Sequence, residues 1–231
     1  MKTVAIVAGA GFGKRLGLKV KKPFIILEGK PLIMYCVHVL DTSPLIDGII
    51  VALERSCVSR FKRLVKKYGL KKVKDIVIGG RTRFESVCNC LERVNDSYDV
   101  VLIHDAARPF INHTLVQKSI AAAKQYGGCV VAVPENDTVK LADGDLFVER
   151  TLDRSHIWRA QTPQVFMRSV IIDACRKMIP GRVHVTDDSS LVERAGNKVR
   201  IVSGFYNNIK ITTREDLAWA KELVKLQRGA S

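Results

Sequence analysis

Short apolar runs and longer amphipathic stretches alternate along the chain. The short runs are rich in valine and isoleucine, which is typical of buried strands. They occupy six segments: Val4–Ala8, Ile49–Leu53, Ile76–Ile78, Val100–Ile103, Cys129–Val133 and Val199–Val202. Because strands that alternate with helices form parallel sheets, the pattern predicts an α/β fold with a mainly parallel sheet.

The longer stretches place apolar residues three and four apart, as one face of an α-helix does. They cover seven segments: Leu32–Leu40, Val58–Tyr68, Arg83–Val94, Thr114–Tyr126, Val170–Lys177, Ser189–Ala195 and Thr213–Gln227. Thr213 is suited to cap the last helix, since Glu215 and Asp216 would then lie in its first turn. We therefore expect helices on both faces of the sheet.

One segment departs from the alternation. Between Asp137 and Arg159, the runs Thr138–Leu141 and Leu146–Thr151 flank the turn sequence Ala142–Asp145, which predicts a projecting β-hairpin. Two strands alone are marginally stable. We therefore expect this arm, at about residues 137–159, to pack on a second subunit. The chain contains no repeat or linker, so we predict a single domain over residues 1–231 that carries the arm.

Composition narrows the class of protein. With 231 residues, 47% hydrophobic and 26% charged, the chain can form one substantial core. No apolar run approaches the roughly 20 residues that span a bilayer, and the N-terminus resembles a first strand and not a signal peptide. We therefore expect a cytoplasmic protein without a membrane partner.

The cysteines give no sign of a metal or disulfide framework. They stand at positions 36, 57, 88, 90, 129 and 175, and no two have the two-residue spacing that is typical of zinc sites. A chain with this much aliphatic core material does not need disulfides to fold. We expect all six cysteines to be reduced and structural.

The formal net charge of +15 suggests nucleic acid, small anionic substrates, or simply solvated helix faces. Eight cations fall at helical spacing around Phe61, Leu64 and Val65: Arg60, Lys62, Arg63, Lys66, Lys67, Lys71, Lys72 and Lys74. This spacing favours a solvated face. A nucleic-acid-binding protein would interleave aromatic residues for stacking. Aromatic residues make up only 6% and none follows this run, so nucleic acid is the least favoured partner.

Candidate chemistry gathers just after the strands, where ligands of open α/β sheets bind. The first loop, Gly9–Gly17, has glycines at alternating positions but fits neither the dinucleotide fingerprint nor the Walker A motif. It ends in Lys14 and Arg15, and Lys21 and Lys22 follow. Cations beside a glycine cradle suit a triphosphate that is attacked at its α-phosphorus. The alternative is a tight turn with incidental basic residues.

Two further strand ends carry polar groups. Gly79–Val87 opens a helix, and Ser86 with backbone groups could hold a base edge or simply cap that helix. Asp105 ends a buried strand, so it needs a partner such as Mg²⁺, its waters or a substrate hydroxyl. The alternative is that Asp105 caps a helix and pairs with Arg108. For His104 we expect a hydrogen-bonded, half-buried histidine.

Polar residues later in the chain leave more alternatives open. Asp187 and Asp188 lie beside an apolar segment and are equally suited to the first turn of a helix. Lys210 lies between two isoleucines in an alternating pattern, so it points either to solvent or into the cleft.

Taken together, these segments resemble the 2-C-methyl-D-erythritol 4-phosphate cytidylyltransferase family of the non-mevalonate isoprenoid pathway. The resemblance extends from Val4 to about Leu217, and its most specific string is His104–Pro109. Further matches follow in family order: Gly9–Leu16, Gly79–Val87, Asp137–Thr138, Thr151–Gln164, Thr186–Asp188 and Asn208–Thr212.

The resemblance implies a Rossmann-like nucleotidyltransferase fold and a homodimer. It implies CTP and a sugar-alcohol phosphate as substrates, with Mg²⁺ or another divalent cation as cofactor. The acceptor phosphate would attack the α-phosphate of CTP directly and release pyrophosphate, without a covalent enzyme intermediate.

The resemblance also implies roles for individual residues. Arg15 and Lys22 match the catalytic pair that stabilises the pentavalent transition state. Nucleotide-binding positions are Ala10, Gly11, Gly13, Gly80, Arg83, Ser86 and Ala106. Substrate-binding positions are Asp105, Arg108, Thr138, Arg154, Thr162, Thr186 and Lys210, and Asp105 also faces the metal. Thr138 and Arg154 lie on the predicted arm, so they would reach the cleft of a neighbouring subunit.

Two departures and one close relative leave choices open. The family loop usually begins Ala-Ala-Gly, and here it is Gly9–Gly11. The catalytic lysine usually follows proline, whereas here Lys21 and Lys22 precede Pro23; the spacing to the next helix favours Lys22. A relative that transfers cytidylyl to ribitol 5-phosphate would use the same cradle.

Overall fold

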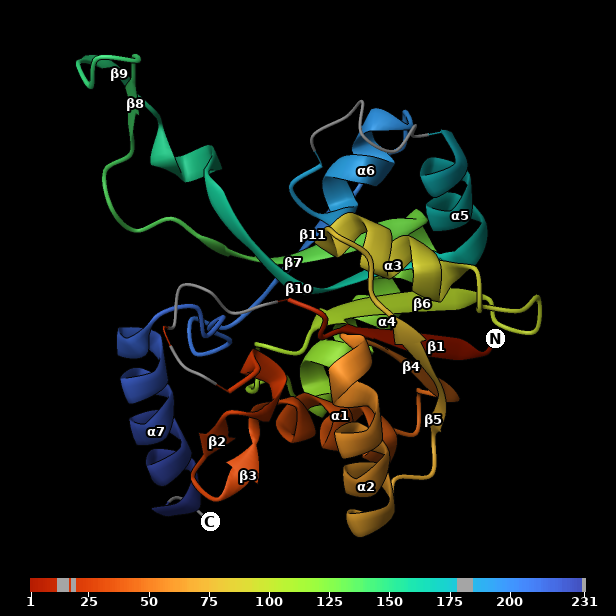
Figure 1. The fold of residues 1–231 in the computed structure, drawn as a ribbon. Helices are drawn as coiled ribbons and strands as arrows, with labels where there is room; N and C mark the ends of the chain where they lie inside the picture. Colours follow the sequence, from red (N-terminus) through yellow and green to blue (C-terminus); the bar gives the residue numbers. More distant parts are fainter. Residues whose placement is uncertain (12–16, 18–19, 178–184, 230–231) are drawn as a thin grey trace.

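A mixed sheet with helices on both faces forms the centre of the protein, as described by a computed structural model (Figure 1). The model describes all residues except 12–16, 18–19, 178–184 and 230–231. Within the described residues, seven strands hydrogen-bond in the order β11-β7-β10-β6-β1-β4-β5. Their bounds are β1 Thr3–Ala8, β4 Gly48–Leu53, β5 Val73–Ile78, β6 Val100–Asp105, β7 Gly128–Pro134, β10 Trp158–Met167 and β11 Arg200–Ser203.

All six predicted strands are confirmed, and the central ones are buried as expected. β1 pairs in parallel with β4 and β6, and its residues alternate between two cores. Ala5 and Val7 pack into one core, and Val4 and Ile6 into the other. The prediction that every strand is buried is wrong for β5 and β11. Each is an edge strand with a single neighbour, so β5 is partly exposed and β11 mostly exposed.

β10 is the strand of the seven-stranded sheet that the sequence pattern does not predict, and the two-residue strands β2 Ile26–Leu27 and β3 Lys30–Pro31 are not predicted either. Strand β10 runs antiparallel between β6 and β7, at the centre of the sheet. Its sequence contains Pro163, and proline in a run usually argues against a central strand. The strand tolerates the proline because its pairing with β7 shifts register between Ala160 and Gln164.

Helices cover both faces, as predicted. In the part of the chain that the structure describes they are α1 Leu32–Thr42, α2 Val58–Lys67, α3 Arg83–Leu91, α4 His113–Tyr126, α5 Arg168–Lys177, α6 Asp188–Arg194 and α7 Arg214–Gly229. Helices α1, α2 and α4 pack on one face, and α3, α5 and α6 on the other. Thr213 caps α7 as expected, since its hydroxyl accepts a hydrogen bond from the Asp216 N–H.

Helix α7 lies beside the sheet and covers a separate small core (Figure 1). This core includes residues from the short elements η2 Lys22–Phe24, β2 Ile26–Leu27 and β3 Lys30–Pro31, or from chain next to them. Its members Ile25, Phe110 and Ile211 each lie within three residues of a site cation in the sequence. The small core therefore anchors the segments that carry Lys22, Arg108 and Lys210.

The predicted hairpin is confirmed as a projecting arm (Figure 1). It consists of β8 Lys140–Ala142 and β9 Val148–Thr151, followed by the short turn η4 Arg154–His156. At its tip Leu146 and Phe147 are 86% and 73% exposed. Such exposure fits the expectation that the arm needs a partner, which stays a prediction.

The basic run over α2 and the loop after it is a largely solvated face, as the spacing indicates. Arg60, Lys62 and Lys66 are exposed while Phe61 is buried beneath them. The short turn η3 Arg55–Cys57 leads into this helix. None of the helices in the described part of the chain could span a membrane.

The prediction that all six cysteines are reduced is wrong. Cys88 on α3 and Cys175 on α5 form a disulfide across 87 positions of sequence. The other four cysteines, all within the described residues, are free and buried. Burial raises the pKa of the Cys36, Cys90 and Cys129 thiols to about 12, so these thiols are poor nucleophiles.

Candidate active site

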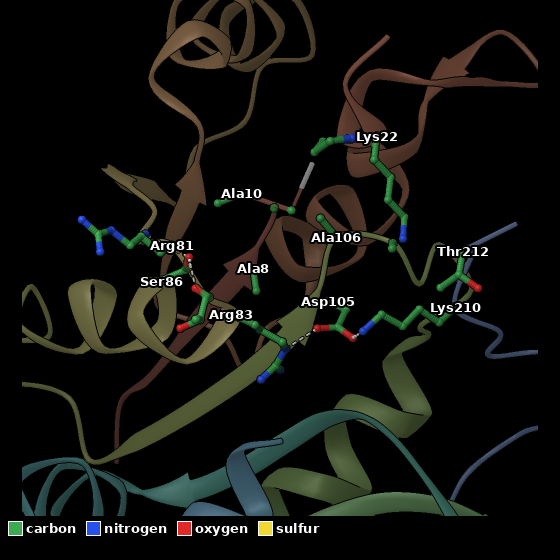
Figure 2. Close-up of a pocket in the computed structure, with 16 residues that line it drawn as sticks. Ala8, Ala10, Lys22, Arg81, Arg83, Ser86, Asp105, Ala106, Lys210 and Thr212 are labelled. Carbon is green, nitrogen blue, oxygen red and sulfur yellow. Dashed lines mark hydrogen bonds and ion pairs between the residues drawn. The ribbon is translucent and has the colours of Figure 1, made fainter. Parts of the chain in front are cut away.

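The described residues line two adjoining cavities at the carboxyl ends of the parallel strands. The first has a volume of about 340 Å³ and the second about 250 Å³. Arg83, Asp105 and Lys210 line both, so they form the boundary between the two. Figure 2 shows the first cavity, with Arg83 and Lys210 approaching Asp105 from opposite sides.

The loops after β1 and β5 form one wall of the first cavity, and they meet so closely that only small residues fit. A Cβ atom on Gly79 would lie 2.2 Å from the Ala10 Cβ and 2.9 Å from the Ser86 Oγ. A Cβ on Gly80 would lie 2.3 Å from the Glu85 Cβ. Gly79 therefore serves the packing of the two loops, and Gly80 serves the packing of its loop against α3.

The start of α3 fixes the second of these loops. Thr82 caps the helix, because its hydroxyl accepts a hydrogen bond from the Glu85 N–H at 3.1 Å. The buried Ser86 hydroxyl donates to the Thr82 carbonyl at 2.8 Å and accepts from the Gly80 N–H at 3.1 Å. Thr82 is therefore the cap, and Ser86 holds the loop against the helix.

Asp105 lies at the boundary of the two cavities, with three cationic side chains around it. Arg83 Nε donates to its Oδ1 at 2.8 Å, and Lys210 Nζ lies 2.7 Å from its Oδ2. Arg108 Nε is 3.9 Å from Oδ2. Burial alone would raise the pKa of Asp105, but Arg83 and Lys210 outweigh it and hold the pKa well below its usual range. The carboxylate is thus ionised. Of the alternative, the pairing of Asp105 with Arg108 is confirmed, but the helix that follows is capped by Asn112 and not by Asp105.

Arg83 has a second carboxylate partner that the sequence does not reveal. Its two terminal nitrogens donate to Asp188 Oδ1 and Oδ2 at 2.9 and 2.7 Å. Burial acts to lower the pKa of Arg83, but Asp188 and Asp105 together raise it above its usual value. The sequence leaves open whether Asp188 is a polar group beside an apolar segment or lies in the first turn of a helix. It occupies the first turn of α6, and its side chain also reaches across to α3.

His104 connects the strand end to the second cavity through a chain of hydrogen bonds. The Asp105 N–H donates to Thr162 Oγ1 at 3.1 Å, and His104 Nδ1 lies 3.0 Å from the same oxygen. His104 Nε2 lies 3.0 Å from the Arg108 carbonyl, which can only accept. The imidazole is therefore protonated at Nε2 and accepts the Thr162 hydroxyl proton at Nδ1. His104 is hydrogen-bonded as expected, but it is fully buried and not half-buried.

The two candidate lysines, of which the sequence spacing favours Lys22, lie in different surroundings. Lys21 Nζ pairs with Glu54 Oε2 at 2.6 Å. Lys22 lines the first cavity, and its side chain points toward the side where Lys210 lies (Figure 2). Gly13 and Arg15, which the resemblance assigned to the cradle and the catalytic pair, lie outside the described residues.

Most of the other predicted site residues line one of the cavities. Ala10, Gly11, Gly80, Ser86 and Ala106 line the first. Arg108, Thr162 and Thr186 line the second, together with Lys210 from the shared boundary. Thr138 and Arg154 line neither; both are exposed on or beside the arm.

Sequence reasoning missed the glutamines of β10. Gln161 and Gln164 both line the second cavity. Gln164 Nε2 donates to Asp187 Oδ2 at 2.7 Å, and its Oε1 accepts from the Ser189 N–H at 2.8 Å. These contacts fix the start of α6 beside the cavity. No local signal could have found them, because the strand that carries them was itself not predicted.

A divalent cation would find few protein ligands here. Among the described residues, no three His, Cys, Asp or Glu side chains gather as metal ligands would. Asp105 is the sole carboxylate residue among the described residues that line the first cavity. Magnesium often binds through one carboxylate together with substrate phosphates. The donor set therefore fits an ion that arrives on a triphosphate, with Asp105 facing it or its waters.

Comparison with known proteins gives one consistent result at the sequence level. A family model described as 2-C-methyl-D-erythritol 4-phosphate cytidylyltransferase matches residues 3–226. Relatives with that name from Clostridium tetani and Alkaliphilus oremlandii are 42% and 40% identical to this chain. The alignments cover 97% and 98% of this chain, and 91% and 97% of the relatives.

Solved structures agree with the sequence comparison. A 4-diphosphocytidyl-2C-methyl-D-erythritol synthase from Anaerococcus prevotii superimposes with a TM-score of 0.88 at 31% identity, covering 97% of this chain and 96% of that one. A 2-C-methyl-D-erythritol 4-phosphate cytidylyltransferase from Thermus thermophilus gives a TM-score of 0.77 at 27% identity, covering 97% and 100%. The α/β fold is therefore that of a nucleotidyltransferase.

Proposed function

This chain belongs to the 2-C-methyl-D-erythritol 4-phosphate cytidylyltransferase family, and from that premise we propose how its two cavities carry out the reaction. The protein is a nucleotidyltransferase. It joins the cytidylyl group of CTP to 2-C-methyl-D-erythritol 4-phosphate and releases pyrophosphate. The ribitol 5-phosphate alternative is not favoured, because the relatives named above carry the erythritol name.

One observation carries the proposal: the two cavities share a wall made of Arg83, Asp105 and Lys210. Two substrates that react directly must lie in adjoining sites with their reacting atoms close together. We assign CTP to the first cavity and the acceptor to the second. The α-phosphorus of CTP then lies near the shared wall.

The chemical step is an in-line displacement. An oxygen of the acceptor phosphate forms a bond to the α-phosphorus, and the bond from that phosphorus to the bridging oxygen breaks. The electron pair leaves with pyrophosphate, so no covalent enzyme intermediate forms. Negative charge on the equatorial oxygens grows in the transition state, and fixed cations there lower the barrier. Lys22 lines this cavity and is suited to that role together with Arg15.

The first cavity suits the nucleotide because its walls leave room for it. Backbone and small side chains at Ala10, Gly11, Gly80 and Ala106 allow close approach of phosphate and base. We assign Gly13 to the same nucleotide site from the family resemblance alone. Ser86 holds the loop whose backbone would meet cytosine. Arg83 forms part of the boundary with the second cavity, and its charge is neutralised by two carboxylates.

The second cavity suits a sugar-alcohol phosphate because it combines cations with hydrogen-bonding groups. Lys210 and Arg108 supply positive charge for the phosphate, and Asp105 an acceptor for a hydroxyl. Thr162 and Thr186 add hydroxyls at its edge. We propose a homodimer in which Thr138 and Arg154 of each arm complete the partner's cavity. The exposed tip of the arm supports this arrangement.

The cofactor and location complete the proposal. Mg²⁺ or another divalent ion would be held by the triphosphate with Asp105 facing it, and it would neutralise phosphate charge. CTP is a cytoplasmic metabolite, so we place the enzyme in the cytoplasm without nucleic-acid or membrane partners.

The test is pyrophosphate release from CTP with each acceptor in the presence of magnesium. Release with the erythritol phosphate and not with ribitol 5-phosphate is expected; the reverse preference would overturn the assignment. Lys22→Ala should lower kcat by roughly 10²-fold or more. Lys21→Ala is the matched control, because Lys21 pairs with Glu54, and it should retain most of the turnover.

A further inference from the structure

Asp188 is a buried carboxylate that lines neither cavity. Its side chain is 3% exposed, and both of its oxygens accept hydrogen bonds from Arg83. The pair joins α6 to α3 across 105 positions of sequence. Such a two-point contact fixes the orientation of the guanidinium plane as well as its position.

Helix capping does not explain the Asp188 side chain. The N-cap of α6 is Asp187, whose carboxylate accepts from the Ser190 N–H at 2.9 Å and forms a capping box with it. The Asp188 carboxylate is directed instead at the Arg83 guanidinium. A buried ion pair is by itself weak evidence for a stabilising role, since burial of both charges has a large cost.

The orientation of Arg83 decides which oxygens of Asp105 stay available. Because both terminal nitrogens of Arg83 are held by Asp188, only its Nε donates to Asp105, at Oδ1. Oδ2 is then left for Lys210. A guanidinium released from Asp188 could instead grip both Asp105 oxygens side by side, because its fork matches a carboxylate.

We propose that Asp188 is a positioning residue of the acceptor site, which it serves by holding Arg83 to a single oxygen of Asp105. This inference rests on the proposed function. Through the pair, the start of α6, where Thr186 and Asp187 line the second cavity, is connected to α3 beside the first. Asp188 thus keeps the Asp105 and Lys210 pair in the geometry that meets the acceptor.

The first experiment is steady-state kinetics of Asp188→Asn, which keeps the shape of the side chain but removes its charge. The acceptor KM should rise roughly tenfold, the size of one lost charged hydrogen bond, and the CTP KM should rise by less, although Arg83 also lines the first cavity. Asp173→Asn is the matched control, because Asp173 is an exposed carboxylate paired with Lys177. An unchanged acceptor KM, or equal increases for both substrates, would overturn the proposal.

The second experiment asks whether Asp188 acts through Arg83. In an Arg83→Gln background, Asp188→Asn should change the acceptor KM by less than about twofold, because the residue it positions is gone. Full additivity of the two changes would overturn the proposal. Should Asp188→Asn fail to fold, Asp188→Glu supplies the same measurement with the charge kept but displaced, and an unchanged acceptor KM there would also overturn it. Wild-type activity with both acceptors is measured in parallel, so failure of the proposed function is seen separately.

Discussion

The two cavities differ in the kinds of residue that line them. Loops of glycine and alanine make up much of the wall of the first, packed so closely that Gly79 and Ala10 leave no room for a further methyl group. Charged and amide side chains line the second, and each is held by a polar partner: Asp105 pairs with Arg83 and Lys210, Arg108 donates to the Asn208 carbonyl, and Gln164 donates to Asp187. Ligand binding in the first cavity thus depends mainly on shape, with Lys22 supplying charge for the chemical step, whereas ligand binding in the second depends on electrostatics.

This difference indicates how each cavity responds to change. Added volume should damage the first and leave the ion pairs of the second in place. Loss of charge should damage the second while the backbone wall of the first persists. The boundary residue Asp105 belongs to both, so substitutions there should have the largest effect of all.

Asp105→Asn should lower kcat/KM for the acceptor by roughly 10²- to 10³-fold, the range for losing one preorganised electrostatic group. The amide cannot neutralise Arg83 and Lys210 together; Arg83 is still held by Asp188, but Lys210 loses its ion pair. Pyrophosphate release over a range of acceptor concentrations measures this effect. CTP affinity, followed by calorimetry, should fall much less.

A carboxylate-to-amide change away from the site calibrates that result. Asp173→Asn removes an exposed ion pair and should alter neither substrate, since such pairs contribute little. If Asp105→Asn instead weakened CTP and the acceptor equally, the assignment of separate roles to the two cavities would be wrong.

The sequence predicts the strands and loops that form the first, shape-dependent cavity well. Buried parallel strands are continuous apolar runs, so β1, β4 and β6 and the loops that follow them can be located from the pattern alone. The helices and the arm follow from periodicity and turn residues. Gly79 and Gly80 stand out because a strand leads directly into them.

The polar contacts around the second, charge-dependent cavity are much less predictable, because the residues that pair there lie far apart along the chain. Asp188 meets Arg83 across 105 positions, and nothing near either residue indicates the pair. The disulfide between Cys88 and Cys175 is not predicted from the sequence for the same reason. Strand β10 contributes several residues to the lining of the second cavity. The sequence pattern does not predict this strand, because Pro163 argues against a central strand and only the pairing with β7 shows how the proline is accommodated.

Gly79→Ala tests the shape-dependent cavity. The new Cβ would lie 2.2 Å from the Ala10 Cβ, so the two loops must separate. CTP affinity should fall roughly tenfold, consistent with the cost of overpacking a close contact, and calorimetry measures it directly. The acceptor KM at saturating CTP should change less.

Gly144→Ala is the matched control for that change. A Cβ on Gly144 meets nothing within 4 Å, so CTP affinity should remain at the wild-type value. A Gly79→Ala variant that bound CTP normally would show that the close contact of the two loops is not what shapes the nucleotide site.

The smallest predicted effect concerns the buried, neutral side chain of His104. Burial lowers the pKa of His104 to about 4, whereas its ordinary value is about 6.5. Between these values the unfolded chain binds a proton that the folded protein does not, so stability is lost as the pH falls. Between pH 6.5 and 5.5 this loss should be about 1 kcal/mol in the free energy of unfolding, measured by urea titration.

His104→Gln should flatten the pH dependence by that same amount, because glutamine does not titrate and can still bridge Thr162 and the Arg108 carbonyl. His38→Gln, at an exposed position, should leave the dependence in place. Parallel curves for wild type and His104→Gln would mean that a charged imidazole is tolerated behind Asp105 and Arg108. In that case the acceptor cavity would not require His104 to be neutral, and its electrostatics would depend only on the side chains that line it.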